Sequence, residues 1–383
     1  MKYSPLSSAK VLLLALTAFA HFSCEKENNE TPAPNPQARL TAKIDSVCRA
    51  SMSDNTVPGM SVVVVKQGQV LFNKSYGVSN LQTQQPVTAD TRFHTGSTNK
   101  AMTAIAVMQL VDRGLIQINR KVTEYLPDFR MADARYQDIT VEHLLTNSSG
   151  IEYGFEEGGF ADDALEQQVA KLANQQLRFS PGQGYEYANA GWSVLGLIVQ
   201  RLSRLPYENY MQANVFQRLG MNNTTLAYWT PNALGGTQGY VLSNQNEVTP
   251  LAPFLNRGYG PAGMVISTSN DIGKYLLMLL ARGRNSQGEQ ILSESSVQAI
   301  LTPHVDAESE MGYPSIRYGY GWEVVNPGQG KAPYLAHGGA IGSMAAVFIL
   351  DPNQQVGVGL LFNRVDYNKV PVADAIRELA TSN

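Results

Sequence analysis

A serine and a lysine stand three residues apart at the start of a long apolar segment. Ser97 and Lys100 precede residues 101–110, which lack Pro and Gly and are predicted to form a buried helix that ends near Arg113. Residues three apart lie on one face of a helix, so the hydroxyl and the amine are expected to be neighbours in its first turn. Because the backbone N–H groups and the dipole of a helix N-terminus favour developing negative charge, this arrangement suits an activated serine nucleophile.

Two further patterns carry polar side chains that such a nucleophile could use. Tyr187 and Asn189 lie in a turn-rich stretch before a predicted helix over residues 193–202, and a constrained loop can project both side chains into a cleft. His337 begins His-Gly-Gly in a predicted strand over residues 333–342, where glycines often mark the close approach of a ligand backbone. Each pattern is weak by itself, since Ser-x-x-Lys, Tyr-x-Asn and His-x-Gly all recur elsewhere in the chain.

The elements that must position these residues come from both ends of the chain. β-Branched and aromatic residues predict strands over residues 60–66 and 70–77, and a matching pair over residues 345–350 and 356–362. A helix over residues 373–381 is expected to follow the second pair. Because the sequence between the two pairs is mainly helical, we predict one sheet built from both termini, with an inserted helical domain.

The first residues of the chain have the pattern of an export signal. A basic start precedes the apolar residues 11–20, a run too short to span a bilayer, so residues 1–23 are predicted to be a signal peptide. Cys24, which a polar stretch follows, is expected to become the lipidated first residue of a bacterial lipoprotein, with residues 24–37 as a Pro-rich tether. Cleavage after Ala20, which would give a soluble secreted or periplasmic protein, is the alternative.

Composition places the chain among ordinary globular proteins. Hydrophobic residues make up 43% and charged residues 16%, and a formal net charge of −3 without a basic run argues against nucleic-acid binding. The five histidines form no H-x-H or H-E-x-x-H pair, and there is no P-loop or dinucleotide fingerprint, so no metal and no cofactor is expected. Cys48, in a predicted helix over about residues 36–53, is interpreted as a small buried hydrophobe.

In their order along the chain, the three patterns resemble the motifs of the serine β-lactamase and penicillin-recognising family. The match is closest to the branch with class C β-lactamases, DD-peptidases and family VIII-type esterases, and it covers about residues 40–379. Asn147 stands where many members have a second histidine. Four further segments resemble family segments: T-x-x-H-L-L within 140–150, F-x-x-L-G-M within 215–224, P-A-G within 261–268 and Y-G-x-G-W at 318–322.

The resemblance implies the β-lactamase/transpeptidase-like fold, an α/β (α+β) architecture in which an antiparallel sheet from both termini is flanked by helices. A catalytic domain is expected over residues 38–383. Its sheet subdomain would comprise about residues 38–115 and 255–383, and its mostly helical subdomain about residues 116–254. The active site is expected between the two subdomains.

The same resemblance implies a role for each patterned residue. Ser97 would attack an acyl carbon, and Lys100 with Tyr187 would form a coupled base, because their mutual proximity can lower both pKa values. The backbone N–H groups of Ser97 and Ala340 would form the oxyanion hole. The residues expected to bind or line the substrate are Asn189, His337, Gly338 and Gly339.

Departures from the family pattern bear on the substrate. Many β-lactamases of this branch have Lys-Thr-Gly where this chain has His-Gly-Gly, and the hydroxyls there help a cation to bind a carboxylate. Gly338 and Ala340 supply no hydroxyl, so this carboxylate anchor is expected to be reduced. An esterase or a D-amino-acid peptidase is therefore favoured over an efficient β-lactamase, although Arg257 or Arg317 could replace the cation.

The sequence therefore predicts an exported serine hydrolase, anchored to a membrane and facing the periplasm or the cell surface. It would act through an acyl-enzyme on a small ester, a β-lactam or a peptidoglycan-type peptide. The alternatives are a penicillin-binding or peptidoglycan-sensing domain with little turnover, and a true class C-like β-lactamase. A purely structural lipoprotein has little support, because a scaffold does not need all three motifs.

Overall fold

The structure is a computed structural model that describes residues 35–52, 56–152, 154, 159–227, 229–230, 232–252, 255–309, 312–313, 316–328, 330 and 332–382. The predicted signal peptide, Cys24 and the predicted tether up to residue 34 lie outside the described residues. Within the described ranges, no helix is both long enough and apolar enough to cross a bilayer.

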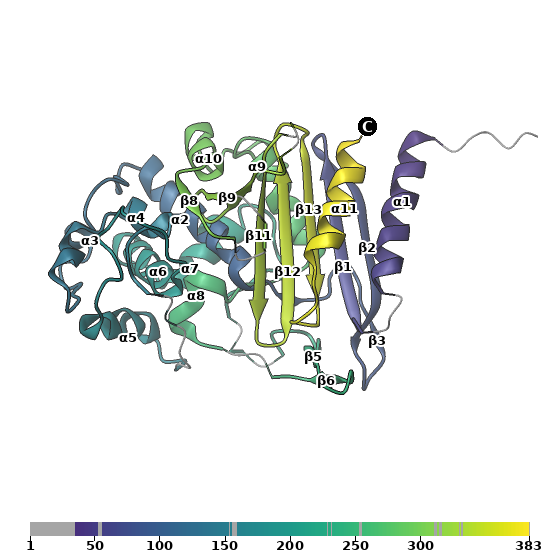
Figure 1. Cartoon of the computed structure of the whole chain (residues 1–383), viewed down its shortest axis with the longest axis horizontal. Coiled ribbons are helices and arrows are strands. Elements are labelled where there is room, and N and C mark those ends of the chain that lie inside the picture. Colours follow the sequence, from purple (N-terminus) through teal and green to yellow (C-terminus); the bar gives the residue numbers. More distant parts are fainter. Residues whose placement is uncertain are drawn as a thin grey trace, which may run out of the picture.

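A large antiparallel sheet built from both termini forms the centre of the described chain (Figure 1). Its strands run in the spatial order β3-β2-β1-β13-β12-β11-β10-β9-β8. Strand β1 near the N-terminus pairs with β13 near the C-terminus, with Met60 opposite Phe362, which confirms the predicted sheet. The strands are β1 (Gly59–Lys66), β2 (Gln69–Asn80), β3 (Gln85–Pro86), β8 (Val305–Ala307), β9 (Ile316–Tyr318), β10 (Glu323–Val325), β11 (Tyr334–Ile341), β12 (Met344–Asp351) and β13 (Val356–Phe362).

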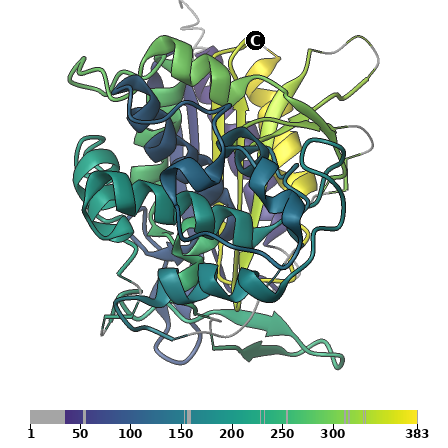
Figure 2. The same cartoon turned by 90° about the vertical axis from the view of Figure 1, so that its left-hand side faces the viewer.

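Helices cover both faces of this sheet (Figures 1 and 2). Helices α1 (Pro36–Ser51) and α11 (Val370–Thr381) pack on one face, in a core that includes Val62 of β1. The other face, which includes Val63, packs against α2 (Asn99–Asp112) and α9 (Ser269–Leu280). Because the central strands are buried on both faces, their sequences read as continuous apolar runs rather than as an alternating pattern.

The remaining helices lie between β2 and β8 in the chain, and most of them form the helical part at the left of Figure 1. Two short antiparallel ladders, β4 (Phe93–His94) with β7 (Ile266–Ser267) and β5 (Tyr240–Leu242) with β6 (Val248–Pro250), complete the strands of the described residues. The helices are α3 (Val122–Tyr125), α4 (Val141–Leu145), α5 (Ala164–Ala170), α6 (Asn189–Ser203), α7 (Tyr207–Met211), α8 (Gly260–Gly263) and α10 (Glu294–Leu301). The short helical turns are η1 (Gly96–Thr98), η2 (Ala134–Asp138), η3 (Lys171–Asn174), η4 (Gln212–Phe216) and η5 (Arg257–Tyr259).

Three helix starts differ from the sequence prediction, and one of them is that of α11, which begins at Val370, three residues before the predicted start at residue 373. Ser97 does not lie in the first α-helical turn but in the tighter turn η1 that precedes it, and Lys100 is the second residue of α2. Helix α6 begins at Asn189, four residues earlier than predicted, so this residue belongs to the helix rather than to the loop. The predicted boundaries of the two subdomains stay predictions.

Helix α1 is fixed to the sheet by a buried apolar face and by one carboxylate. Cys48 is buried in this face, as predicted. The carboxylate of Asp45 accepts hydrogen bonds from Tyr76 Oη at 2.6 Å, Lys74 Nζ at 2.8 Å and Arg49 Nε at 3.0 Å. The hydrogen bond from Lys74, followed by that from Tyr76, holds the pKa of Asp45 well below its usual range. The ionised carboxylate therefore stabilises the packing of α1 on the sheet.

We predict that Asp45→Asn lowers the free energy of unfolding by about 1 kcal/mol at pH 7, because it removes charge-assisted hydrogen bonds that solvent partly screens. A carboxyl group whose pKa is depressed by folding contributes stability above its unfolded pKa of about 4, and loses it as the pH falls. The difference between the two chains, measured by urea unfolding, should therefore shrink below pH 4.

Asp138→Asn is the matched control, since its carboxylate pairs with the half-exposed Lys121 at the protein surface. Its effect should stay below about 0.5 kcal/mol. Equal losses in the two variants would contradict the role given to Asp45.

Candidate active site

Ser97 is held where the turn η1 presses against the edge of strand β11. Gly96 adopts a φ of +56°, and a Cβ at this position would lie 2.5 Å from the backbone N of Ala340. A Cβ on Gly339 would overlap the carbonyl oxygen of Thr95. Both positions thus require glycine, and the close approach brings the backbone of Ser97 beside that of Ala340, the two N–H groups predicted to form the oxyanion hole.

Lys100 is fully buried, and its amine is surrounded by oxygen atoms. The Nζ atom lies 3.2 Å from Ser97 Oγ, 2.6 Å from Asn189 Oδ1 and 2.9 Å from the carbonyl oxygen of Ala262. The last two oxygens can only accept hydrogen bonds, so they take two N–H donors of the amine. In the ammonium form the third N–H points to Ser97, and in the neutral form the lone pair does. The geometry therefore suits proton exchange between Lys100 and Ser97.

The amine of Lys100 lies over the ring of Tyr187, so the two residues predicted to form a coupled base are neighbours in the structure. Lys100 Nζ is 4.5 Å from the centroid of the Tyr187 ring, a distance at which an ammonium is attracted to the aromatic face. The ring of Tyr187 is also 6.3 Å from the ring of His337, between centroids. Asn189, two residues on, begins α6 and uses its Oδ1 atom to hold Lys100. The helical part and the sheet thus meet at Tyr187.

His337 is a neutral imidazole with a fixed tautomer. Its Nδ1 atom lies 2.6 Å from the carbonyl oxygen of Gly338, so this nitrogen carries the proton and donates it. Its Nε2 atom is therefore the acceptor for the hydroxyl of Tyr318 at 3.2 Å. Burial, with a smaller contribution from the charge of Lys100, lowers the pKa of His337 to about 3. His337 therefore supplies no positive charge at neutral pH.

A small cavity of about 170 Å³ opens beside Ser97. None of its described lining residues carries a charge. Met264, Ile341 and Val365 make part of the wall apolar. The full lining is Ser97, Asn189, Tyr259, Ala262, Gly263, Met264, Ala340, Ile341, Gly342 and Val365. A carboxylate in this cavity would therefore meet no charged side chain among the described lining residues.

Neither arginine suggested by the sequence as a replacement cation lines this cavity. Arg257 forms ion pairs with Asp162 at 2.6 Å and with Glu208 at 2.8 Å. Arg317 pairs with Asp306 at 3.1 Å on the sheet edge. Among the described residues, both cations are thus directed to carboxylates of the chain itself rather than to the cavity at Ser97.

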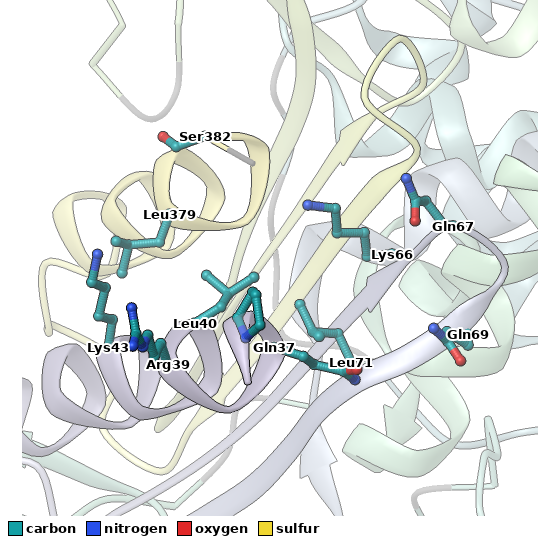
Figure 3. Close-up of a pocket in the computed structure, with 11 residues that line it drawn as sticks. Gln37, Arg39, Leu40, Lys43, Lys66, Gln67, Gln69, Leu71, Leu379 and Ser382 are labelled. Atoms are coloured by element: carbon teal, nitrogen blue, oxygen red, sulfur yellow. The ribbon is translucent and has the colours of Figure 1, made fainter. Parts of the chain in front are cut away.

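A larger hollow, of about 460 Å³, lies elsewhere, between α1, the β1–β2 hairpin and the end of α11 (Figure 3). Its described lining contains Arg39, Lys43 and Lys66 together with leucine and glutamine side chains. It holds none of the residues from the three sequence patterns. The arrangement of nucleophile, amine and oxyanion donors, and not cavity size, therefore identifies the candidate active site.

Two residues that contact the site were not predicted to have a role there. Tyr318, whose hydroxyl is bonded to Nε2 of His337, entered the sequence analysis only as part of the Y-G-x-G-W segment. Asn147 accepts hydrogen bonds from the backbone of the loop that carries Tyr187, and it was noted only as a departure from the family pattern. Their positions in recognisable segments were the signal available in the sequence.

Comparison with known proteins gives a family and a fold. The family model described as "Beta-lactamase" matches residues 44–382. Protein flp of Staphylococcus aureus (strain MW2) is 24% identical over 84% of this chain, which spans only 62% of the length of flp. Penicillin-binding protein 4 of Amycolatopsis lactamdurans is 28% identical over 82% of this chain and 83% of its own length. A class C β-lactamase mutant shares the fold, with a TM-score of 0.76 and 21% identity over 90% of this chain and 99% of that one.

We predict that the ring of His337 does not titrate between pH 5 and pH 8. Burial and the nearby charge of Lys100 hold its pKa to about 3, so its ring NMR signals should stay constant over this range. A His337→Gln variant would identify the signals by their loss. In the chain unfolded in urea the same residue should titrate near pH 6.5. A midpoint near 6.5 in the folded chain would instead mean that His337 supplies a cation to the site.

Proposed function

The chain belongs to the beta-lactamase family of serine hydrolases, and we propose that it hydrolyses small esters with uncharged acyl groups through an acyl-serine intermediate. The uncharged lining of the cavity beside Ser97 is the observation that carries the choice of substrate. A peptidase acting on a D-amino-acid peptide would have to bind a terminal carboxylate, and the neutral His337 offers it no charge.

In the proposed reaction, Ser97 Oγ attacks the carbonyl carbon of the ester and transfers its proton to the pair formed by Lys100 and Tyr187. The oxyanion would accept hydrogen bonds from the backbone N–H groups of Ser97 and Ala340, each worth about 3 kcal/mol. The C–O bond of the leaving alcohol then breaks, and the alcohol takes the proton back. This leaves an ester between the acyl group and Ser97.

Water completes the cycle by the same route. The Lys100 and Tyr187 pair would accept a proton from water as its oxygen attacks the acyl carbon, and the carboxylic acid would leave as the proton returns to Ser97. Asn189 would assist by holding Lys100 through its Oδ1 atom, while its amide N–H groups would donate to the carbonyl side of the substrate. His337, Gly338 and Gly339 would form the strand edge beside the bound acyl group.

Export and lipid anchoring form the second part of the proposal. They are supported by the basic start, the short apolar run and the polar stretch after Cys24, all of which lie outside the described residues. A lipid on Cys24 and the Pro-rich segment that follows would hold the catalytic domain at a membrane surface.

We predict that Ser97→Ala lowers kcat/KM for p-nitrophenyl butyrate by on the order of 10³-fold or more, because it removes the nucleophile. Ser79→Ala is a control, since Ser79 is buried in β2 and its hydroxyl donates to the carbonyl oxygen of Gln85 rather than to a residue of the candidate site. It should keep wild-type activity.

The same preparations would be incubated with a D-alanyl-D-alanine peptide and with a fluorescent penicillin. Little release of D-alanine by the wild-type chain is expected, because no described residue that lines the cavity beside Ser97 carries a positive charge for the terminal carboxylate. Efficient peptide release would overturn the ester preference. A stable penicillin adduct on Ser97 without turnover of either substrate would instead support a binding domain.

We predict that Cys24→Ser moves the protein from the membrane fraction to the soluble fraction of expressing bacteria, and that it abolishes incorporation of a labelled fatty acid. Ester hydrolysis should be unchanged, because the residue lies outside the catalytic domain. Retention of the variant in the membrane fraction, without the label, would contradict lipid anchoring at this cysteine.

A further inference from the structure

Asn147 forms hydrogen bonds on both sides of Tyr187. Its carbonyl oxygen accepts the N–H of Glu186 at 2.9 Å. Its side-chain Oδ1 accepts the N–H of Ala188 at 3.4 Å and the indole N–H of Trp192 at 3.0 Å. The two backbone bonds flank Tyr187, and the third reaches into the first turn of α6, the helix that begins with Asn189. The residues before and after Tyr187 are thus both fixed to Asn147 through their N–H groups.

The backbone at Asn147 is itself firmly held. The residue is 2% exposed and has a φ of +55°, in the left-handed region that asparagine adopts more readily than most residues. Its N–H donates to the carbonyl oxygen of Leu144, and the following N–H, of Ser148, donates to that of His143 at 2.8 Å. These hydrogen bonds go to carbonyl oxygens in the last turn of α4, so the backbone of Asn147 is fixed to this helix. Asn147 is therefore a rigid support for the loop that carries Tyr187 and not a part of that loop.

We propose that Asn147 is a positioning residue that sets Tyr187 against Lys100. The inference rests on the proposed function, in which the Lys100 and Tyr187 pair accepts the proton of Ser97. The contact between Tyr187 and Lys100 depends on the path of a loop whose N–H groups are bonded to Asn147. Because a displacement of about 1 Å at a reacting group can cost about 100-fold in rate, this support has a direct effect on catalysis.

The indole of Trp192 gives the support a second function. Trp192 is fully buried in α6, and its N–H needs a hydrogen-bond partner there. By accepting this N–H, Asn147 also fixes the rotation of α6, whose first residue holds Lys100. Both partners of the amine that come from this part of the chain, Tyr187 and Asn189, are therefore placed by the same side chain.

The test uses two variants of Asn147 that distinguish the contribution of its backbone from the contribution of its side chain. Asn147→Gly keeps the positive φ and the bond from Glu186 but removes Oδ1. Asn147→Asp keeps the acceptor oxygens but adds a negative charge beside the loop. Asn246→Gly is the matched control, because Asn246 also has a positive φ, of 60°, in an exposed turn between β5 and β6.

For Asn147→Gly we expect kcat for p-nitrophenyl butyrate to fall 10- to 100-fold while KM changes less than threefold, because only proton transfer is misaligned. The NMR signal of the Trp192 indole N–H should move upfield as its bond is lost. For Asn147→Asp the indole signal should stay, and the alkaline shift of the pH–kcat profile should exceed 0.5 pH unit, because a nearby carboxylate disfavours phenolate. Asn246→Gly should match wild type in all three measurements.

An unchanged kcat in a folded Asn147→Gly chain whose Trp192 signal has moved would overturn the proposal. The proposal would also be overturned if kcat fell and KM rose by the same factor while the pH profile stayed unshifted. This result would indicate that the whole site had become less ordered, and not that Tyr187 alone had moved. If the wild-type chain lacks ester turnover, the rate at which fluorescent penicillin acylates Ser97 replaces kcat. A wild-type chain that shows neither reaction overturns the proposed function, and this inference with it.

Discussion

The buried amine of Lys100 is the constraint on which the site depends. Burying an amine costs free energy unless polar atoms of the protein replace the water that hydrates it. Here three oxygen atoms replace that water, and they belong to Ser97 of η1, Asn189 of α6 and Ala262 of α8. The helical part must therefore close on α2 in one arrangement. Further bonds maintain it, since Asn99 Nδ2 and Thr103 Oγ1 donate to the carbonyl oxygens of Gly260 and Pro261, each at 2.7 Å.

The sheet contributes the second half of the site through backbone contact rather than through charge. Glycines at positions 96 and 339 let η1 and β11 approach so closely that side chains are excluded between them. His337, on the same strand, is neutral and hydrogen-bonded within the protein. Lys100 lies beside Ser97, but its amine is already bonded to the oxygens of Asn189 and Ala262. These features are the support for the proposed uncharged acyl substrate.

Much of the fold was predictable from local patterns. The strands at both ends were found because buried strands are rich in β-branched residues, and β13 has the predicted bounds. The helix starts were less accurate. Ser97 lies in a tighter turn before α2, and α6 starts at Asn189, because contacts with Lys100 and β11, rather than capping residues, set both starts.

The sequence by itself determined which residue types occur in which order, and that order indicated a serine nucleophile, a coupled base and a glycine-rich strand edge. Only the tertiary structure decided what these groups contact. The carbonyl oxygen of Ala262 that holds Lys100, the Tyr318 hydroxyl that fixes His337 and the Asn147 oxygens that flank Tyr187 are distant in the chain. A backbone oxygen leaves no trace in residue type, and a buried hydroxyl or amide reveals its partner only when the chain path brings the two together.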